Sequence, residues 1–170
     1  AGAGAVSSMR RRGRAVRDRA PLCLYAGSSI PPELLAWWGP DTRQVDTAPL
    51  GLDGIEAVFV AAHEAGGDVA RLHSGDLSLY RAVAEQIAGL ERRGIAYTLT
   101  PGVPAFAAAS AALGRALTVP GVAQCLVLTR LSWRASAMPE AGTLEPFAST
   151  GAPPATHLAV HRLGDAWRPL

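Results

Sequence analysis

Residues 69–93 carry the pattern that most restricts how this chain can fold. An apolar run typical of a buried strand, 69–72, leads directly into the small turn Ser74-Gly75-Asp76, and apolar residues at helical spacing complete the segment. Strand, short turn and helix in this order are typical of α/β proteins, which present ligands at the carboxyl ends of parallel strands. Gly75 permits a tight turn, and Asp76 adds a carboxylate. On this stretch alone, an ordinary strand-to-helix turn is the simpler interpretation.

The same alternation of strands and helices runs through the whole chain. Strands are predicted at residues 21–26, 44–50, 69–72, 96–99, 124–129 and 155–160. Helices are predicted at residues 31–38, 53–65, 78–93, 105–113 and 144–149, with Ser78 as the expected N-cap of the third and a further helical stretch at 165–168. The predicted class is α/β, with an N-terminal α/β domain over residues 1–120. Residues 121–170 are expected to form only part of a C-terminal α/β domain, because they contain two convincing strands.

The composition narrows the classes of function. Hydrophobic residues make up 49% of the 170 residues and charged residues 18%, so the chain can bury a core. A net charge of +2 argues against a dedicated nucleic-acid binder, and no apolar run is long enough to span a membrane. The arginine-rich segment 10–19 is compatible with a solvated helix, a disordered arm or an anion-binding surface, and the solvated interpretation is favoured. Cys23 and Cys125 lie in apolar runs and are predicted to be buried free thiols, which fits a reducing compartment such as the cytoplasm.

Few residues in the chain suggest metal or nucleophilic chemistry. His157 and His161 are four residues apart, but they fall in or beside a predicted strand without carboxylate or cysteine ligands nearby, so we expect no metal site. Ser74 has no identifiable base, and neither cysteine lies in a polar turn. What remains is a set of small-residue turns at three strand ends, 26–28, 74–76 and 101–105. Lining one edge of a parallel sheet, they predict a mostly apolar pocket for a nucleoside-containing cofactor.

Five short motifs, in one order, resemble a known family. They are Leu24-Tyr25-Ala26-Gly27-Ser28, Asp46-Thr47-Ala48-Pro49-Leu50, Arg71-Leu72-His73-Ser74-Gly75-Asp76 with Ser78-Leu79-Tyr80, Pro101-Gly102-Val103-Pro104-Ala105-Phe106, and Leu128-Thr129-Arg130. Over about residues 21–163 the chain resembles the tetrapyrrole methylase family. Within it, the chain is most similar to the members of cobalamin biosynthesis that methylate C-11 of a corrinoid precursor, precorrin-4 or cobalt-precorrin-4.

The resemblance implies a homodimer of two-domain α/β subunits, with S-adenosylmethionine as methyl donor between the domains and without a metal, nucleic acid or membrane partner. The cofactor positions it implies are Ser74, Gly75, Asp76, Pro104, Ala105 and Leu158. It implies catalytic positions at Asp46 and Tyr25 and substrate positions at Arg130 and Ser28. Asp46 is the hypothetical acceptor of a proton lost during methylation.

The chain also departs from the family pattern. Members begin with a strand and a loop like Gly-Pro-Gly-Asp, whereas residues 2–8 lack proline and acid and follow no strand. Leu77 stands where proline is usual, and the second domain is shorter than usual. We therefore expect a chain truncated at both ends. Two alternatives remain open: a methylase for another tetrapyrrole, and an inactive remnant that acts only as a binding or dimerisation module.

Overall fold

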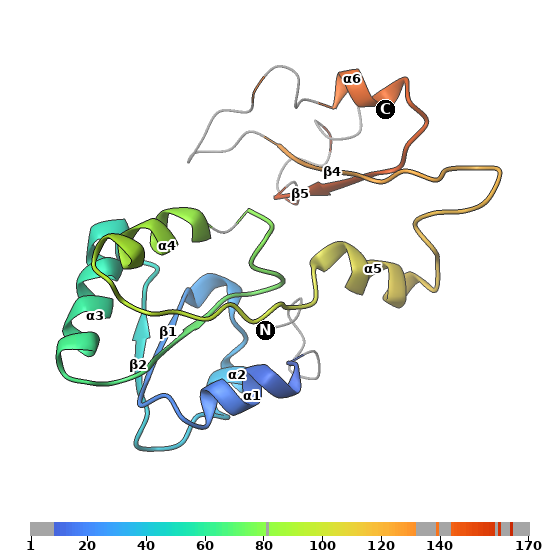
Figure 1. Cartoon of the computed structure of the whole chain (residues 1–170). Helices are drawn as coiled ribbons and strands as arrows, with labels where there is room; N and C mark the ends of the chain where they lie inside the picture. The colour runs from blue at the N-terminus through green and yellow to red at the C-terminus, as the bar shows by residue number, and fades with distance from the viewer. Residues whose placement is uncertain are drawn as a thin grey trace. The chain divides into compact units, whose positions relative to one another are not determined.

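The computed structural model describes residues 9–80, 82–131, 139, 144–158, 160 and 164, and in them helices and strands alternate as expected of the α/β class (Figure 1). In chain order the elements are α1 (Arg11–Arg17), β1 (Leu22–Tyr25), the 3₁₀ turn η2 (Gly27–Ser29), α2 (Pro32–Leu35), β2 (Arg43–Asp46), α3 (Leu52–Glu64), β3 (Val69–Leu72), α4 (Val83–Arg92), α5 (Ala105–Leu113), β4 (Val127–Arg130), α6 (Glu145–Ala148) and β5 (Pro154–His157). The chain divides into two compact units, Ala1–Ala108 and Ala109–Leu170, which are described separately. The expected domain boundary after residue 120 stays a prediction.

A parallel sheet in the order β2-β1-β3 forms the centre of the first unit. Leu22 at the start of β1 lies level with Arg43 of β2 and Val69 of β3. Parallel strands covered on both faces are apolar throughout, and β1 follows this rule because Cys23 and Leu24 are both fully buried. All three strands therefore present their carboxyl ends at one edge of the sheet, which is where the predicted turns at 26–28 and 74–76 begin.

Alternate residues of β1 point to opposite faces of the sheet, and each face has its own core. Leu22 and Leu24 pack with Ile55 and Phe59 of α3. The opposite face is a larger cluster that includes residues beside α1 and in or after α2: Met9, Ala20, Cys23, Ile30, Leu34, Trp38, Ala70 and Leu72. Helices thus cover both faces, which is the layered arrangement that the alternating sequence pattern predicts.

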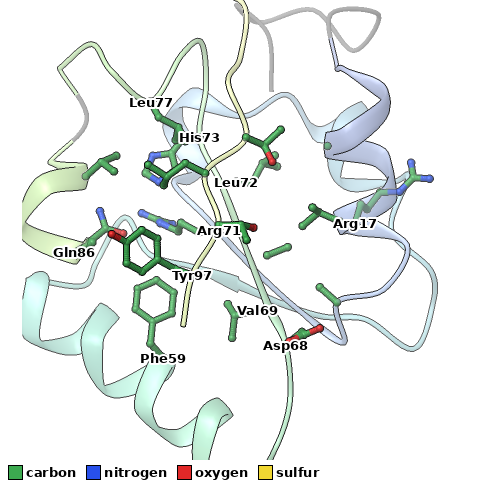
Figure 2. Close-up of a pocket in the computed structure, with 18 of the residues that line it drawn as sticks. Arg17, Phe59, Asp68, Val69, Arg71, Leu72, His73, Leu77, Gln86 and Tyr97 are labelled. Carbon is green, nitrogen blue, oxygen red and sulfur yellow. The ribbon is translucent and has the colours of Figure 1, made fainter. Parts of the chain in front are cut away.

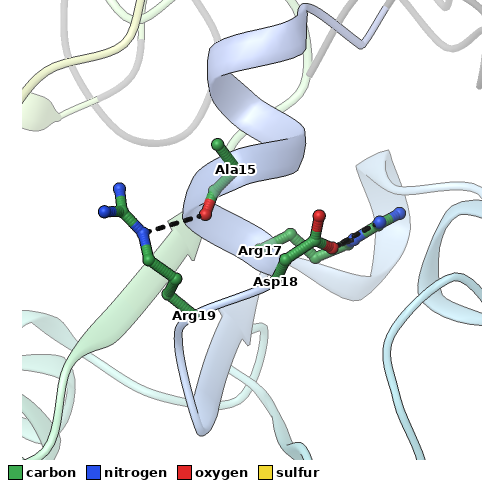
Figure 3. A network of polar contacts seen from close by, with 4 residues as sticks. All are labelled: Ala15, Arg17, Asp18 and Arg19. Atoms are coloured by element: carbon green, nitrogen blue, oxygen red, sulfur yellow. Dashed lines mark hydrogen bonds and ion pairs between the residues drawn. The ribbon is translucent and has the colours of Figure 1, made fainter.

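The arginine-rich segment forms helix α1, as the solvated-helix interpretation expects. Its last turn is basic, which suits the negative end of a helix dipole, and Arg19 Nε donates to the carbonyl of Ala15 at 3.2 Å (Figure 3). Arg17 Nε donates to Asp18 at 2.7 Å. The guanidinium of Arg14 lies 4.9 Å from the ring centroid of Trp37, so this indole is covered by a cation. Trp38 is buried, so the two tryptophans serve core and surface packing.

The helix predicted from Ser78 begins at Val83 instead, so that prediction was wrong by five residues. Tyr80 and Ala82 have φ angles of 54° and 44°, and a left-handed residue cannot be part of an α-helix. Ser78 is not an N-cap either. Its N–H and hydroxyl both donate to Oδ1 of Asp76, at 2.9 and 2.6 Å, so it closes the turn before the helix.

The strand predicted at residues 96–99 is not formed. No hydrogen bond joins residues 96–101 to another described backbone group, and a strand without a neighbour has no ladder to stabilise it. The strands expected at 44–50, 124–129 and 155–160 are present over shorter stretches, and the helix expected at 31–38 ends at Leu35. Helix α5 has the predicted bounds.

The second unit contains β4 and β5, a parallel pair in which Arg130 lies level with His157. Cys125 is exposed, because β4 begins only at Val127, so its predicted burial was wrong, whereas Cys23 is buried as predicted. The helical stretch expected at 165–168 lies outside the described residues. Among the described helices none is long and apolar enough to cross a membrane.

Candidate functional site

The turn after β1 is closed by Asp46, the last residue of β2. The backbone N–H groups of Ala48 and Gly27 donate to the same carboxylate oxygen, Oδ1, at 2.8 and 2.9 Å. These two bonds, that from Ala48 first, lower the pKa of Asp46, and the charge of Arg71 adds to the effect. Asp46 is therefore held as a charged acceptor that orders the turn 26–29.

Thr47 and Arg71 connect the ends of all three strands. The Thr47 N–H and hydroxyl donate to the carbonyl of Tyr25 at 2.7 and 2.9 Å, and Arg71 Nη1 donates to the Thr47 hydroxyl at 2.8 Å. Burial lowers the pKa of Arg71. Neither Thr47 nor Arg71 is among the site residues predicted from the sequence. The available signal was Arg71 itself, a charged residue in an otherwise apolar strand, which requires a polar partner.

Asp76 joins the turn after β3 to the segment that precedes α5. Its Oδ1 accepts the two bonds from Ser78, and its Oδ2 accepts the N–H of Gly102 at 2.7 Å. The hydroxyl of Ser78 contributes most to lowering the Asp76 pKa, followed by the Ser78 N–H and then the Gly102 N–H. The predicted cofactor positions in these two segments are thus brought together by one carboxylate.

Both segments are made of residues that leave the backbone accessible. Gly75 is buried with a φ of 70°, a conformation that glycine adopts without strain. Gly102 is also buried, and Pro104 and Ala105 follow it, with Ala105 opening α5. Ser74 is half-buried beside Gly75. A ligand at this place meets backbone groups and small side chains.

The remaining predicted positions, Arg130, Leu158 and Ser28, lie in β4, after β5 and in η2. Arg130 ends β4 and is half-buried, and its Nη1 donates to the carbonyl of Leu131 at 3.3 Å. Leu158 follows β5 with a φ of 57° and is 62% exposed. A bulky side chain on a left-handed residue is strained, and such strain is concentrated at functional positions. Ser28 belongs to η2 and directly follows Gly27, whose N–H donates to Asp46.

Among the described residues, no three histidine, cysteine or acidic side chains gather where a metal ion would be held. His157 lies in β5, as the strand interpretation expects, and its Nδ1 is 3.1 Å from the Ala155 carbonyl. His161 lies outside the described residues. The expectation of no metal therefore stays a prediction.

Comparison with known proteins decides the family. The sequence profile described as Tetrapyrrole (Corrin/Porphyrin) Methylases matches residues 1–170, the whole chain. The chain belongs to the tetrapyrrole methylase family. This confirms the family resemblance that the five motifs indicate, and it agrees with the parallel α/β fold.

Individual tetrapyrrole methylases show how far the likeness extends. The chain is 61% identical over 163 residues to a precorrin-4 C(11)-methyltransferase of Sinorhizobium sp.. The aligned residues are 96% of this chain and 64% of that protein. The chain thus spans less than two thirds of this relative's length. The X-ray structure of a cobalt precorrin-4 methyltransferase, a cobalamin biosynthetic enzyme, matches with a TM-score of 0.93 and 28% identity over 99% of this chain and 70% of that one.

A third structure, the uroporphyrin-III C-methyl transferase of Thermus thermophilus complexed with S-adenosyl homocysteine, has a TM-score of 0.71. At 22% identity, over 95% of this chain and 64% of that one, this match shows the shared fold alone.

Proposed function

We propose that this chain carries part of an S-adenosylmethionine-dependent C-methyltransferase that methylates C-11 of precorrin-4 or cobalt-precorrin-4 in cobalamin biosynthesis. The observation that carries the proposal is the set of three hydrogen bonds that Asp76 accepts, two from Ser78 and one from Gly102, here called the Asp76 clamp. Asp76 directly follows Ser74 and Gly75, and its bond from the Gly102 N–H ties their turn to the segment that continues into Pro104 and Ala105. This connection supports the assignment of five of the six implied cofactor positions, Asp76 included, to these two segments. The names of two relatives, a precorrin-4 and a cobalt-precorrin-4 C(11)-methyltransferase, support the choice of substrate.

The residues of these two segments fit the proposed methyl donor. Gly75 and Gly102 place no side chain in front of their own backbone groups, which leaves room for a flat nucleoside and hydrogen-bonding groups to hold it. All three hydrogen bonds observed at the Asp76 carboxylate are donated by groups of the protein, so its role is to hold the two segments together. Ser74, Pro104 and Ala105 supply the remaining contacts of these two segments, and Leu158 is the sixth implied cofactor position.

Bound S-adenosylmethionine supplies a methyl group made electrophilic by the positive sulfur, and the electron-rich macrocycle supplies the carbon nucleophile. The protein's contribution is to hold the two in line and to exclude water, which is the proximity effect. Arg130 and Ser28 bind the substrate, and Arg130 offers a cation to its carboxylates. Tyr25 lies at the end of β1, where its carbonyl fixes Thr47 beside Asp46.

Asp46 is the proposed acceptor of the proton that the macrocycle loses. Its lowered pKa keeps it ionised, and both of its observed bonds use Oδ1, which leaves Oδ2 toward the turn. Two variants separate this chemistry from the anchoring role. Asp46→Asn retains an oxygen for the Gly27 and Ala48 N–H groups but loses basicity, whereas Asp46→Ala loses both. Full turnover by Asp46→Asn would exclude Asp46 as the base.

The first test is calorimetric titration of the 170-residue chain with S-adenosylmethionine, for which micromolar binding is expected. Gly75 and Gly66 provide a matched pair, because their φ angles are 70° and 69° but only Gly75 belongs to the proposed site. We expect Gly75→Ala to weaken binding at least tenfold and Gly66→Ala to leave it unchanged, although both strain the backbone. Absence of binding to the unaltered chain would favour the inactive remnant.

Leu158 provides a test in the second unit. Leu158→Gly relieves the left-handed strain, so the variant should be at least as stable as the unaltered chain while it binds S-adenosylmethionine more weakly. Unchanged affinity would remove Leu158 from the site. The finer substrate assignment is checked by mass spectrometry: incubation with precorrin-4 should add one methyl group, and methylation of uroporphyrinogen III alone would identify a methylase for another tetrapyrrole.

We further propose that the protein is a cytoplasmic homodimer. Two free cysteines fit a reducing compartment, and the family resemblance implies the dimer. Light scattering coupled to size exclusion should give twice the 17.6 kDa mass of the chain.

A further inference from the structure

Residues 10–19 concentrate positive charge in a unit that is otherwise negative. They contain six arginines and one aspartate, which is a formal net charge of +5. The first unit, Ala1–Ala108, contains eleven arginines and eleven acidic residues, so the part of it outside this segment has a formal net charge of −5. A charge separation of this kind attracts anions to one part of a surface and repels them from the rest.

Most of the arginine side chains in this segment have no acidic partner. The exposed ones, none of which takes part in an ion pair between described residues, are Arg10, Arg11, Arg12, Arg14 and Arg19. Arg17 is half-buried and pairs with Asp18 (Figure 3). The fork of an arginine matches the two oxygens of a carboxylate, so the exposed side chains are available to carboxylates from outside the chain.

Three of these arginines follow one side of α1 and form an arginine stripe, defined as Arg10, Arg14 and Arg17. Their spacing of four and three residues places them on successive turns of one helix face. The guanidinium carbons of Arg14 and Arg17 lie 4.9 and 5.8 Å from the ring centroid of Trp37, which is 36% exposed. Figure 2 shows the side chain of Arg17 directed away from β3. The stripe therefore combines cations with a flat aromatic surface at one of its ends.

The other end of the stripe reaches the segments proposed to hold the methyl donor. Arg10, Gly75 and Gly102 all line one cavity of about 570 Å³. The hydroxyl of Ser78 contributes most to lowering the pKa of Asp76, and the positive charge of Arg10 makes a smaller contribution. Arg10 is therefore within electrostatic reach of the Asp76 clamp, and an anion bound along the stripe lies next to this clamp.

The length of the stripe and the weakness of single surface contacts select the class of ligand. The helical rise separates Arg10 from Arg17 by about 10 Å along α1. One exposed ion pair contributes little, so an anion is held only when several of its charges bind at once. A flat polycarboxylate of similar width meets this requirement. A long polyanion such as a nucleic acid would extend over the negative remainder of the unit.

We propose that the arginine stripe is a capture surface for the carboxylates of the tetrapyrrole substrate, separate from the substrate positions predicted from the sequence. Carboxylates at the rim of the macrocycle pair with Arg10 and Arg14, while the Trp37 ring supports the guanidinium of Arg14. Asp18 already pairs with Arg17 and so limits the charge that the stripe offers. The identity of the substrate rests on the proposed function, whereas the binding of a polycarboxylate tetrapyrrole to α1 is measured without it.

The test is a fluorescence titration of uroporphyrin I, a stable octacarboxylate tetrapyrrole, with the 170-residue chain. We expect saturable binding that is at least fivefold tighter than that of coproporphyrin I, a tetracarboxylate with the same ring. Because exposed charges are screened by salt, the affinity for uroporphyrin I should fall at least tenfold between about 50 and about 500 mM salt.

Variants with matched charge locate the bound macrocycle. The double change of Arg10→Gln and Arg14→Gln should weaken uroporphyrin I binding at least fivefold. The control changes Arg92→Gln and Arg93→Gln remove the same charge from α4, which covers the other face of the sheet, and should alter the affinity less than twofold. Arg14→Lys retains the charge and should also stay within twofold, with circular dichroism confirming that all variants fold.

A gain of affinity provides a second arm that does not depend on weakening the helix. Asp18→Asn releases Arg17 from its ion pair and should tighten uroporphyrin I binding at least twofold. Glu64→Gln removes one negative charge from the exposed end of α3 and serves as the control, for which no tightening is expected. Equal tightening in both variants would show that net charge alone determines binding.

Further outcomes overturn the proposal or support it. Equal weakening by the two arginine pairs, or the absence of saturable binding, would overturn it. Equally tight binding of a single-stranded oligonucleotide, with the same loss in the stripe variant, would overturn it by identifying a general polyanion surface. Titration with S-adenosylmethionine is separate: a chain that binds this donor but shows no dependence on the stripe keeps the proposed function and loses the capture surface. Stripe-dependent uroporphyrin I binding without donor binding would do the reverse.

Discussion

Replacement of Asp76 by alanine is the sharpest test of how the site is assembled. The change removes the acceptor for the Gly102 N–H, which is buried, and the acceptor for two bonds from Ser78. A buried N–H left without a partner costs about 1–3 kcal/mol, and the more exposed Ser78 bonds contribute about 0.5–1 kcal/mol together. We therefore expect Asp76→Ala to lower the free energy of unfolding by about 2–3 kcal/mol.

Urea unfolding followed by tryptophan fluorescence measures this loss. With a slope near 2 kcal/mol per molar urea, the midpoint should fall by about 1–1.5 M. Ser78→Ala is the matched control, because it removes only the hydroxyl bond and should shift the midpoint by about 0.3 M or less. Hydrogen exchange at Gly102 should accelerate in Asp76→Ala and stay nearly unchanged in Ser78→Ala.

The pH dependence gives an independent check. The pKa of Asp76 is lowered in the folded chain from its ordinary value of 3.8, so its stabilisation is fully present above about pH 4 and is lost as the pH falls through the folded pKa. The difference in unfolding free energy between the unaltered chain and Asp76→Ala should be constant from pH 5 to 7 and shrink below pH 4. Equal stability of the two proteins at pH 7, or a difference that grows on acidification, would refute the reasoning.

Two further predictions concern the first turn and the cysteines. A Cβ added at Gly27 would overlap Oδ2 of Asp46, so Gly27→Ala should lower the melting temperature. The control is Gly51→Ala, which should change the melting temperature little because the added carbon meets nothing within 4 Å. Similar shifts in both variants would contradict the close contact at Gly27. Burial raises the pKa of Cys23 to about 12, whereas Cys125 is exposed. At pH 8 a thiol reagent should therefore modify only Cys125 in the folded chain and both cysteines in urea. Rapid reaction of two thiols in the folded chain would show that Cys23 is accessible.

The proposed methyl-donor segments were identifiable from sequence because their residue types are required by their local conformation. Gly75 has a positive φ, and the residues around it are small or polar. Asp76 was recognisable as a carboxylate at a strand end, but its partners were not. Ser78 lies two residues away and was read as a helix cap, while Gly102 is 26 residues away and can be paired with Asp76 only by the fold.

The hydrophobic pattern also predicted β1, β3 and α5, since burial on both faces or helical spacing leaves a local signature. It could not predict that α4 begins at Val83, because the left-handed conformations of Tyr80 and Ala82 are imposed by the surrounding chain. It predicted a strand at residues 96–99 from composition alone. A strand, however, exists only with a neighbour, and the described chain provides none.

The α/β class, the family and the turns that carry small residues could all be predicted from the amino-acid sequence, because those properties depend on local spacing and residue type. Which side chains meet depends on the fold. The bond from Gly102 to Asp76, the bonds from Gly27 and Ala48 to Asp46, the burial of Arg71 against Thr47 and the open edge of β3 depend on strand order. Contacts between residues far apart in sequence have no local signature, and the parallel sheet is what brings them together.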